Sequence, residues 1–118
     1  MNLKMSTRQI DGITVIDCNG RIVFGEEAAA LREMVKGLLP KSPRIVLNLK
    51  DVSYIDSGGL GMLVGIYSSA RSAGGEVKLA SLTQRVNQLL QVTKLVTVFE
   101  VADNAESAVK SFSKGAGV

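Results

Sequence analysis

The sequence predicts a single α/β domain with a mostly parallel sheet, and three observations lead to this prediction. Strand-like apolar runs alternate with helical patterns along the chain, which is the arrangement of βαβ units. The connections between these segments are short, and no internal repeat or low-complexity linker interrupts them. A length of 118 residues with a 46% hydrophobic share suits one compact domain. We therefore expect one domain over residues 3–112 and a flexible C-terminal tail over 113–118.

The first two strands are predicted to form a hairpin. Residues 3–10 have the polar, weakly alternating pattern of an edge strand. Asp11-Gly12 follows, flanked by two isoleucines, and this dipeptide is typical of two-residue hairpin turns. The returning strand is predicted over 13–18, with Asn19-Gly20 ending it. The hairpin adds one antiparallel edge strand to the sheet.

An amphipathic helix and a buried strand are predicted next. From Gly25 apolar residues recur on one helix face, and the prolines at 40 and 43 end the pattern. The first turn holds Glu26 and Glu27, where the helix dipole favours acids. The apolar face consists of Ala28, Leu31, Val35 and Leu38, with Met34 beside them. The run 44–55 is then apolar enough for a buried strand.

The second half is predicted to continue the alternation of helices and strands. In order, the expected elements are a helix from Ser57 ended by Gly74-Gly75, a strand over 77–80, a helix over 83–92, a strand over 96–99 and a last helix that begins at Asp103. Glycine pairs commonly end helices in a left-handed cap. Asp103 followed by Glu106 resembles a capping box. About four helices are expected in all.

The most informative segment is Asp56-Ser57-Gly58-Gly59-Leu60-Gly61, between the buried strand and the helix that follows it. It places the hydroxyl of Ser57 in the first helical turn, where free N–H groups and the positive end of the helix dipole tolerate an anion. Ser57 is therefore well placed to carry a phosphate. The alternative is that Asp56 or Ser57 only caps the helix. Glycines this early in a helix each cost about 0.5–1 kcal/mol relative to alanine, and such broken local rules favour a functional explanation.

The composition argues against catalysis at this segment. The chain has no histidine, so the commonest general base and metal ligand is missing, and we expect no catalytic residue, metal site or cofactor. A nucleophile elbow, G-x-S-x-G, fails because Ile55 stands where its first glycine belongs. No Gly-Lys-Ser/Thr follows to complete a Walker loop. A receiver domain phosphorylated on Asp56 would also need an acidic pair and a lysine that the corresponding strand ends lack.

Charge and hydropathy exclude other classes. The net charge of +3 arises from 14 basic and 11 acidic residues that are scattered, so no nucleic-acid partner is expected. No apolar stretch approaches the roughly 18 residues of a membrane span, which predicts no membrane insertion. The N-terminus lacks the apolar segment of a secretory signal, and a cytoplasmic location is expected. Cys18 is the only cysteine and is predicted to be a small core residue.

The chain resembles the STAS domain, in particular the bacterial anti-sigma factor antagonists. Their motif D-S-[ST]-G-[LI]-G corresponds to residues 56–61 here, and the stretch 45–55, the Gly74-Gly75 turn and the late Leu89-Leu90…Leu95…Phe99 pattern are also similar. The resemblance implies that an anti-sigma factor acting as a serine kinase phosphorylates Ser57. It implies that the unphosphorylated form binds this kinase and frees a sigma factor, and that a PP2C-type phosphatase restores that form. Asp56, Gly58, Gly59 and Leu60 would lie in the contact surface.

The sequence departs from the family at two places. Gly58 stands where the family often has serine or threonine, and Gly20-Arg21-Ile22-Val23 replaces the common Gly-Glu-Leu-Asp. Arg21 is therefore expected either to meet an acidic patch of the partner or to be solvated. An alternative function is a STAS subunit that docks constitutively on a larger complex, such as a lipid-transport ATPase or a sensory assembly, without reversible phosphorylation.

Overall fold

The computed structural model describes the backbone of residues 3–116 and the side chains of residues 3–112. The elements in order are β1 (Leu3–Ile10), β2 (Ile13–Ile22), α1 (Glu26–Leu38), β3 (Arg44–Ile55), α2 (Ser57–Ser72), β4 (Glu76–Ala80), α3 (Gln84–Val92), the 3₁₀ helix η1 (Leu95–Thr97), β5 (Val101–Ala102) and α4 (Ala105–Ala116). The predicted tail begins inside α4, whose backbone stays helical through Ala116, and residues 117–118 lie outside the described part.

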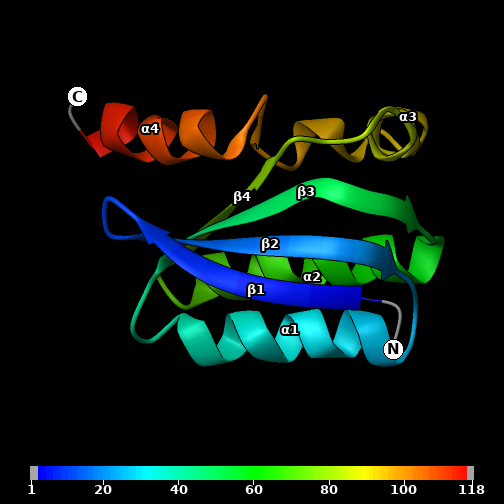
Figure 1. Cartoon of the computed structure of the whole chain (residues 1–118), viewed down its shortest axis with the longest axis horizontal. Coiled ribbons are helices and arrows are strands. Elements are labelled where there is room, and N and C mark those ends of the chain that lie inside the picture. Colours follow the sequence, from blue (N-terminus) through cyan, green and yellow to red (C-terminus); the bar gives the residue numbers. More distant parts are fainter. Residues whose placement is uncertain (1–2, 117–118) are drawn as a thin grey trace.

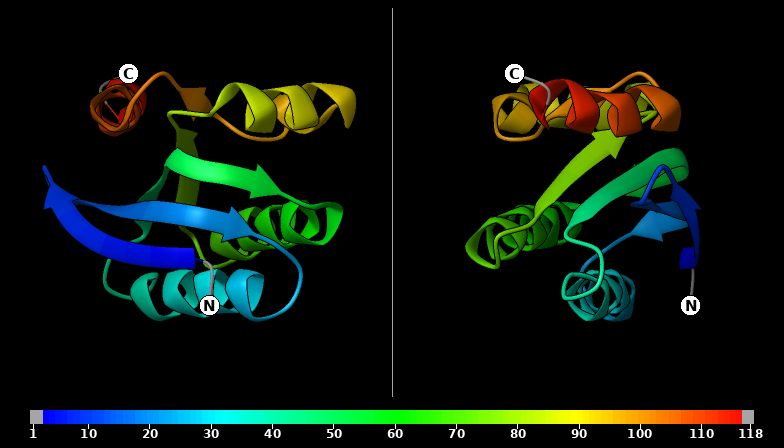
Figure 2. Two further views of the ribbon diagram at one scale, coloured as in Figure 1. Left: turned by 45° about the vertical axis from the view of Figure 1, so that its right-hand side comes forward. Right: turned by 90° about the vertical axis from the view of Figure 1, so that its left-hand side faces the viewer.

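One five-stranded sheet with the order β1-β2-β3-β4-β5 forms the centre of the domain. β1 and β2 are antiparallel, whereas the other three pairings are parallel. Helices α1 and α2 cover one face of the sheet, and α3 and α4 lie on the other (Figures 1 and 2). This confirms the predicted α/β class, with one antiparallel edge strand, a parallel remainder and four α-helices over residues 3–116.

The hairpin forms as predicted, but β2 is longer than expected. Asp11 and Gly12 have φ values of 52° and 80°, as a two-residue turn requires. The prediction that Asn19-Gly20 ends the strand is wrong, because β2 continues to Ile22. The register between β2 and β3 shifts between Asp17 and Asn19 and again between Gly20 and Arg21, and at each shift β3 has one residue more than β2. Gly20 has a φ of 125° within this irregular stretch. Pairing on both sides, with Leu3 and with Val52, keeps the strand in the sheet.

Two groups of buried side chains form the core. The larger group joins the sheet to α1 and α2 and extends to α3, with Leu31, Leu47 and Leu63 nearly inaccessible to solvent. The smaller lies between the sheet and α4 and includes Val15, Val46 and Phe112. Alternate residues of the central strands point to opposite faces, so Val46 packs against α4 while its neighbour Leu47 packs against the helices opposite.

The predicted strand over 96–99 is wrong. Lys94 has a positive φ of 61°, and the chain then forms η1 instead of extending. The apolar residues of this run pack onto the core from a compact turn, and Phe99 meets the ring of Tyr67 edge-on at a centroid distance of 5.5 Å. A short apolar run does not distinguish a strand from another buried segment. The last strand is β5, which pairs with Leu79 and Ala80.

Helix α4 begins at a different cap residue from the one that the sequence predicted. Asn104, rather than the predicted Asp103, caps α4, because its Oδ1 accepts a hydrogen bond from the N–H of Ser107 at 2.8 Å.

Lys78 of β4 is 5% exposed and faces α4. Its Nζ donates to Ser111 Oγ at 2.7 Å and lies 2.9 Å from Glu100 Oε2. The buried charge is thus paired at the sheet–helix interface.

Candidate functional site

Asp56 is the residue that caps α2. It has extended backbone angles, and its Oδ1 accepts a hydrogen bond from the N–H of Gly59 at 2.6 Å. Its carbonyl oxygen accepts the N–H of Leu60 at 2.9 Å, and its own N–H donates to the carbonyl of Ile22 at 3.3 Å. Of the two capping candidates in the sequence, the structure therefore selects Asp56. Ser57 becomes the first helical residue, exposed to solvent and not needed for the cap.

The same aspartate also binds the loop that joins β2 to α1. The backbone N–H of Phe24 donates to Asp56 Oδ1 at 3.0 Å and to Oδ2 at 3.2 Å. The side chain of Phe24 is 76% exposed, which is unusual for a residue of this size. The sequence analysis missed Phe24. Its signal was a large apolar side chain in a loop, outside both flanking periodic patterns.

Two positions of the motif suit glycine because atoms of the loop after β2 and of the end of β2 approach them closely. A Cβ at Gly59 would collide with the carbonyl oxygen of Ile22 and lie 2.8 Å from its carbon, so the end of β2 leaves room only for hydrogen. A Cβ at Gly58 would collide with the Cβ of Phe24 and lie 3.0 Å from two ring carbons. The family's serine or threonine at this position would displace Phe24. The departure at Gly58 thus has a local physical cause.

The structure places the other predicted contact residues at different depths. Leu60 is 4% exposed and packs in the larger core, and Gly59 is also buried. These two residues position the first turn of α2, and neither is accessible at the surface. Arg21 is exposed at the end of β2, where its register partner on β3 is Tyr54. The guanidinium of Arg85 on α3 lies 5.8 Å from the centre of the Tyr54 ring.

One apolar hollow lies at the start of α2, and another lies between the end of β3 and α3. One of about 460 Å³ is lined by Phe24, Gly58, Gly61 and Met62, among other residues. The other, of about 320 Å³, is bordered by Tyr54 and by Val92, which is 75% exposed. Exposed aromatic and aliphatic side chains around an accessible hydroxyl are typical of a protein–protein contact surface.

Reactive and metal-binding groups are scarce in the described part of the chain. Over these residues no group of three His, Cys, Asp or Glu side chains is arranged to hold a metal ion. Cys18 is buried as predicted, and this burial, together with the negative charge of Asp17, raises the pKa of its thiol to about 12. None of the helices over residues 3–116 has the length and apolarity that crossing a bilayer needs.

Comparison with known proteins identifies the family. The model of the STAS domain matches residues 4–108. The chain belongs to the STAS domain family. Among its relatives, the anti-sigma-B factor antagonist of Bacillus subtilis is 32% identical over 111 residues, which cover 93% of this chain and 100% of that protein. The anti-sigma F factor antagonist of Paenibacillus polymyxa is 26% identical over 92% of this chain and 94% of its own length.

A solved structure agrees with the fold described above. The crystal structure of TM1081 from Thermotoga maritima has a TM-score of 0.76 and 27% sequence identity, and the match covers 91% of this chain and 92% of TM1081. The resemblance seen in the motif at residues 56–61 therefore extends over the whole STAS domain.

Proposed function

We propose that this protein is an anti-sigma factor antagonist that acts as a partner switch controlled by phosphorylation of Ser57. In this proposal the unphosphorylated form binds an anti-sigma factor that is a serine kinase, and so releases a sigma factor. A PP2C-type phosphatase regenerates that form. The protein itself performs no catalysis and works in the cytoplasm. The observation that carries the proposal is the exposed Ser57 at the start of α2, relieved of the capping role by Asp56, in a chain whose relatives are named antagonists.

The local geometry supports a phosphate at Ser57. The N–H groups of Gly59 and Leu60 are taken by the side chain and the carbonyl of Asp56. The first-turn N–H groups of Ser57 and Gly58 have no acceptor within an α-helix and remain for a phosphate. The helix dipole contributes about 0.3–1 kcal/mol to an anion at this position. Phosphorylation therefore needs no rearrangement of the helix.

Phosphorylation would act on binding mainly through charge. A phosphoserine adds roughly −1.5 to −2 charges, which lowers the net charge of +3 to near +1. Burying this dianion against a surface that fits a neutral hydroxyl costs several kcal/mol. Since about 1.4 kcal/mol corresponds to a tenfold change in affinity, binding falls by two or more orders of magnitude.

The contact surface that we propose surrounds Ser57. Phe24, whose N–H is bound by Asp56, lies against Gly58 on one side and provides an exposed aromatic anchor. Arg21 lies at the end of the neighbouring strand and suits an acidic group on the partner. Aromatic and arginine side chains are the types that most often dominate binding energy at interfaces. Leu60 and Gly59 contribute by fixing the first turn of α2.

A second candidate is a STAS subunit that docks on a larger assembly without reversible phosphorylation. The replacement of the family's two acids by Arg21 and Val23 favours it, because this alters the partner surface next to Ser57. Both functions use the same face of the protein. They differ in whether a negative charge at Ser57 changes binding.

The deciding experiment combines intact mass with pull-down. The intact mass of the protein purified from its native host is measured by mass spectrometry. Ser57→Ala and Ser57→Asp variants serve as baits in the pull-down. Ser68→Asp is the control, because it adds an acid to the exposed face of the same helix. The switch predicts a phosphate-sized mass addition that is absent from Ser57→Ala. It also predicts a kinase-fold partner that is retained by Ser57→Ala and Ser68→Asp and lost by Ser57→Asp. An unmodified mass, with one partner on all baits, would support constitutive docking instead.

A further inference from the structure

A separate cavity of about 520 Å³ lies between α1 and α2, toward the ends of these helices that are remote from Ser57. Its floor is apolar, since it contains Val35 and Ile66, which are each 2% exposed. This volume falls within the roughly 300–1,000 Å³ that is usual for small-molecule sites. The hollow beside Phe24 shares Arg32 and Ser69 with this cavity, so the two adjoin on the surface of α2.

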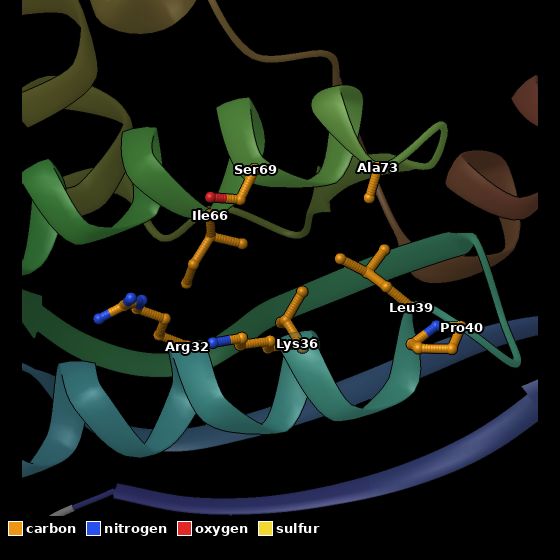
Figure 3. A pocket seen from close by; sticks show the side chains of 8 residues that line it. Arg32, Lys36, Leu39, Pro40, Ile66, Ser69 and Ala73 are labelled. Carbon is orange, nitrogen blue, oxygen red and sulfur yellow. The ribbon is translucent and has the colours of Figure 1, made fainter.

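The two charged side chains of the cavity lie at one of its ends, and the apolar lining continues beyond them. Figure 3 shows the side-chain nitrogens of Arg32 and Lys36 at one end, and Leu39 and Pro40 at the other. Arg32 and Lys36 are four residues apart on α1 and so lie on the same face of the helix. A ligand that follows this cavity would meet two cations first and hydrocarbon afterwards.

The two cations have no carboxylate partner in the cavity. No acidic residue is among the lining side chains, and Glu33, the acid next to Arg32, is not one of them. The ion pairs between described residues involve Arg8 and Lys78 instead. Arginine and lysine are both charged at neutral pH. The positive charge at this end is therefore available to an anion.

We infer that this cavity binds a small amphiphile with one anionic head group on an apolar body of medium length. The head group, a carboxylate, sulfate or phosphate monoester, would lie between Arg32 and Lys36 and accept hydrogen bonds from them. The apolar body would extend over Val35 and Ile66 toward Leu39. The inference rests on the placement of charge and hydrocarbon, and it is independent of phosphorylation at Ser57.

The test is a titration followed by amide chemical shifts of the ¹⁵N-labelled protein. The probes are octanoate, octyl sulfate and octyl phosphate, all below their micelle concentrations, with neutral 1-octanol and cationic octyltrimethylammonium for comparison. We expect saturable shifts confined to residues 31–39 and 65–74 for the three anions, and much weaker binding of the other two probes. The order of affinity among the anions identifies the preferred head group.

Variants separate a built site from general attraction. Arg32→Gln/Lys36→Gln should weaken octanoate binding by about tenfold or more, because charged hydrogen bonds are lost. Lys50→Gln/Lys110→Gln removes the same charge from exposed positions outside the cavity and should leave binding unchanged. Ala73→Leu should weaken all the anions, because it fills the apolar end from an exposed position. The inference is overturned by the absence of saturable shifts at millimolar ligand. Equal binding of 1-octanol, or equal losses in both double variants, would overturn it as well.

Discussion

The backbone N–H of Phe24 and the carboxylate of Asp56 are hydrogen-bonded although they are 32 residues apart in the sequence. The same carboxylate accepts the N–H of Gly59. One side chain thus fixes both the loop after β2 and the first turn of α2. As a result, the exposed ring of Phe24 and the hydroxyl of Ser57 are presented on one surface in a defined arrangement.

Asp56→Ala should therefore destabilise the fold more than Ser57→Ala. The loss of an N-cap costs about 0.5–2 kcal/mol, and the N–H of Phe24 also loses its acceptor. We expect the free energy of unfolding, measured with urea, to fall by about 2 kcal/mol. Ser57→Ala should change it by less than about 0.5 kcal/mol, because Ser57 is exposed and does not cap. Equal losses in the two variants would show that Asp56 does not hold the loop.

The glycines of α2 should differ sharply in their response to alanine. Gly59→Ala should cost about 2–3 kcal/mol or more, because its methyl group meets the backbone of Ile22, which cannot move aside. Gly61→Ala is the matched control. Its added methyl group meets nothing within 4 Å, so the variant should be more stable by about 0.5–1 kcal/mol.

Gly58→Ala should be intermediate, since its methyl group meets the side chain of an exposed loop residue, Phe24. A double-mutant cycle with Phe24→Gly tests this directly. Removing the Cβ of Phe24 should recover part of the loss, which appears as a coupling energy of about 0.5 kcal/mol or more in urea unfolding. If the effects of the two substitutions are additive, the loss of stability in Gly58→Ala does not arise from contact with Phe24.

Lys78 should stabilise the docking of α4 through packing as much as through charge. Its ammonium group lies 4.2 Å from the centre of the Phe112 ring, in addition to its contacts with Ser111 and Glu100. Lys78→Ala should cost about 2 kcal/mol, whereas Lys78→Met, which keeps an unbranched apolar chain, should cost about half as much. Urea unfolding measures both losses, and hydrogen exchange of the α4 amides should rise in the same order.

Glu100→Gln is the control for the charge of this pair. Glu100 is 59% exposed at its side chain, so its ion pair with Lys78 is screened and its loss should cost at most about 1 kcal/mol. A loss as large as that of Lys78→Ala would mean that the ion pair, and not the packing, holds α4.

The sequence predicted most of the fold because its strongest signals are local. The Asp11-Gly12 turn, the helix face with Leu31 and Val35, and the long apolar run of β3 each specify an element without help from distant residues. The errors arose where distant contacts decide. Gly20 stays in a strand because both neighbouring strands pair with it. The run that ends at Phe99 is a compact turn packed on the core, with Phe99 itself against Tyr67.

At the candidate site, too, local features could be predicted and features that depend on distant contacts could not. The position of Ser57 at the start of a helix could be predicted from the strand–turn–helix pattern. The choice of Asp56 as the cap and the exposure of Phe24 could not, because both depend on the meeting of two loops that are far apart in the sequence. The burial of Leu60 agrees with the helical spacing that it shares with Leu63 and Val64, whereas its assignment to the contact surface came from the family resemblance.

The diagonal pair of Arg8 on β1 and Asp17 on β2 should give the stability of the edge hairpin a dependence on acid pH. Arg8 Nε donates to Asp17 Oδ2 at 2.7 Å, and Asn48 donates to the same carboxylate. These bonds, that of Arg8 first, lower the pKa of Asp17 in the folded protein. The unfolded chain therefore binds this proton at a higher pH than the folded protein does, and stability falls as protons are added. The contribution is complete above the ordinary aspartate pKa of about 3.9 and is lost as pH falls through the lowered value.

Asp17→Asn measures this contribution. The carboxylate is about one-third exposed, so we expect a loss of about 0.2–1 kcal/mol at pH 7 in urea unfolding at low salt. The difference from the wild type should begin to shrink as pH falls below about 4, where the unfolded wild-type chain binds a proton at Asp17, and should vanish once the folded protein is protonated there as well. Arg8→Gln should show the same loss at pH 7, and high salt should reduce it because the pair is exposed. A difference that stays constant down to pH 2 would mean that Asp17 acts through the shape of its hydrogen bonds and not through its charge.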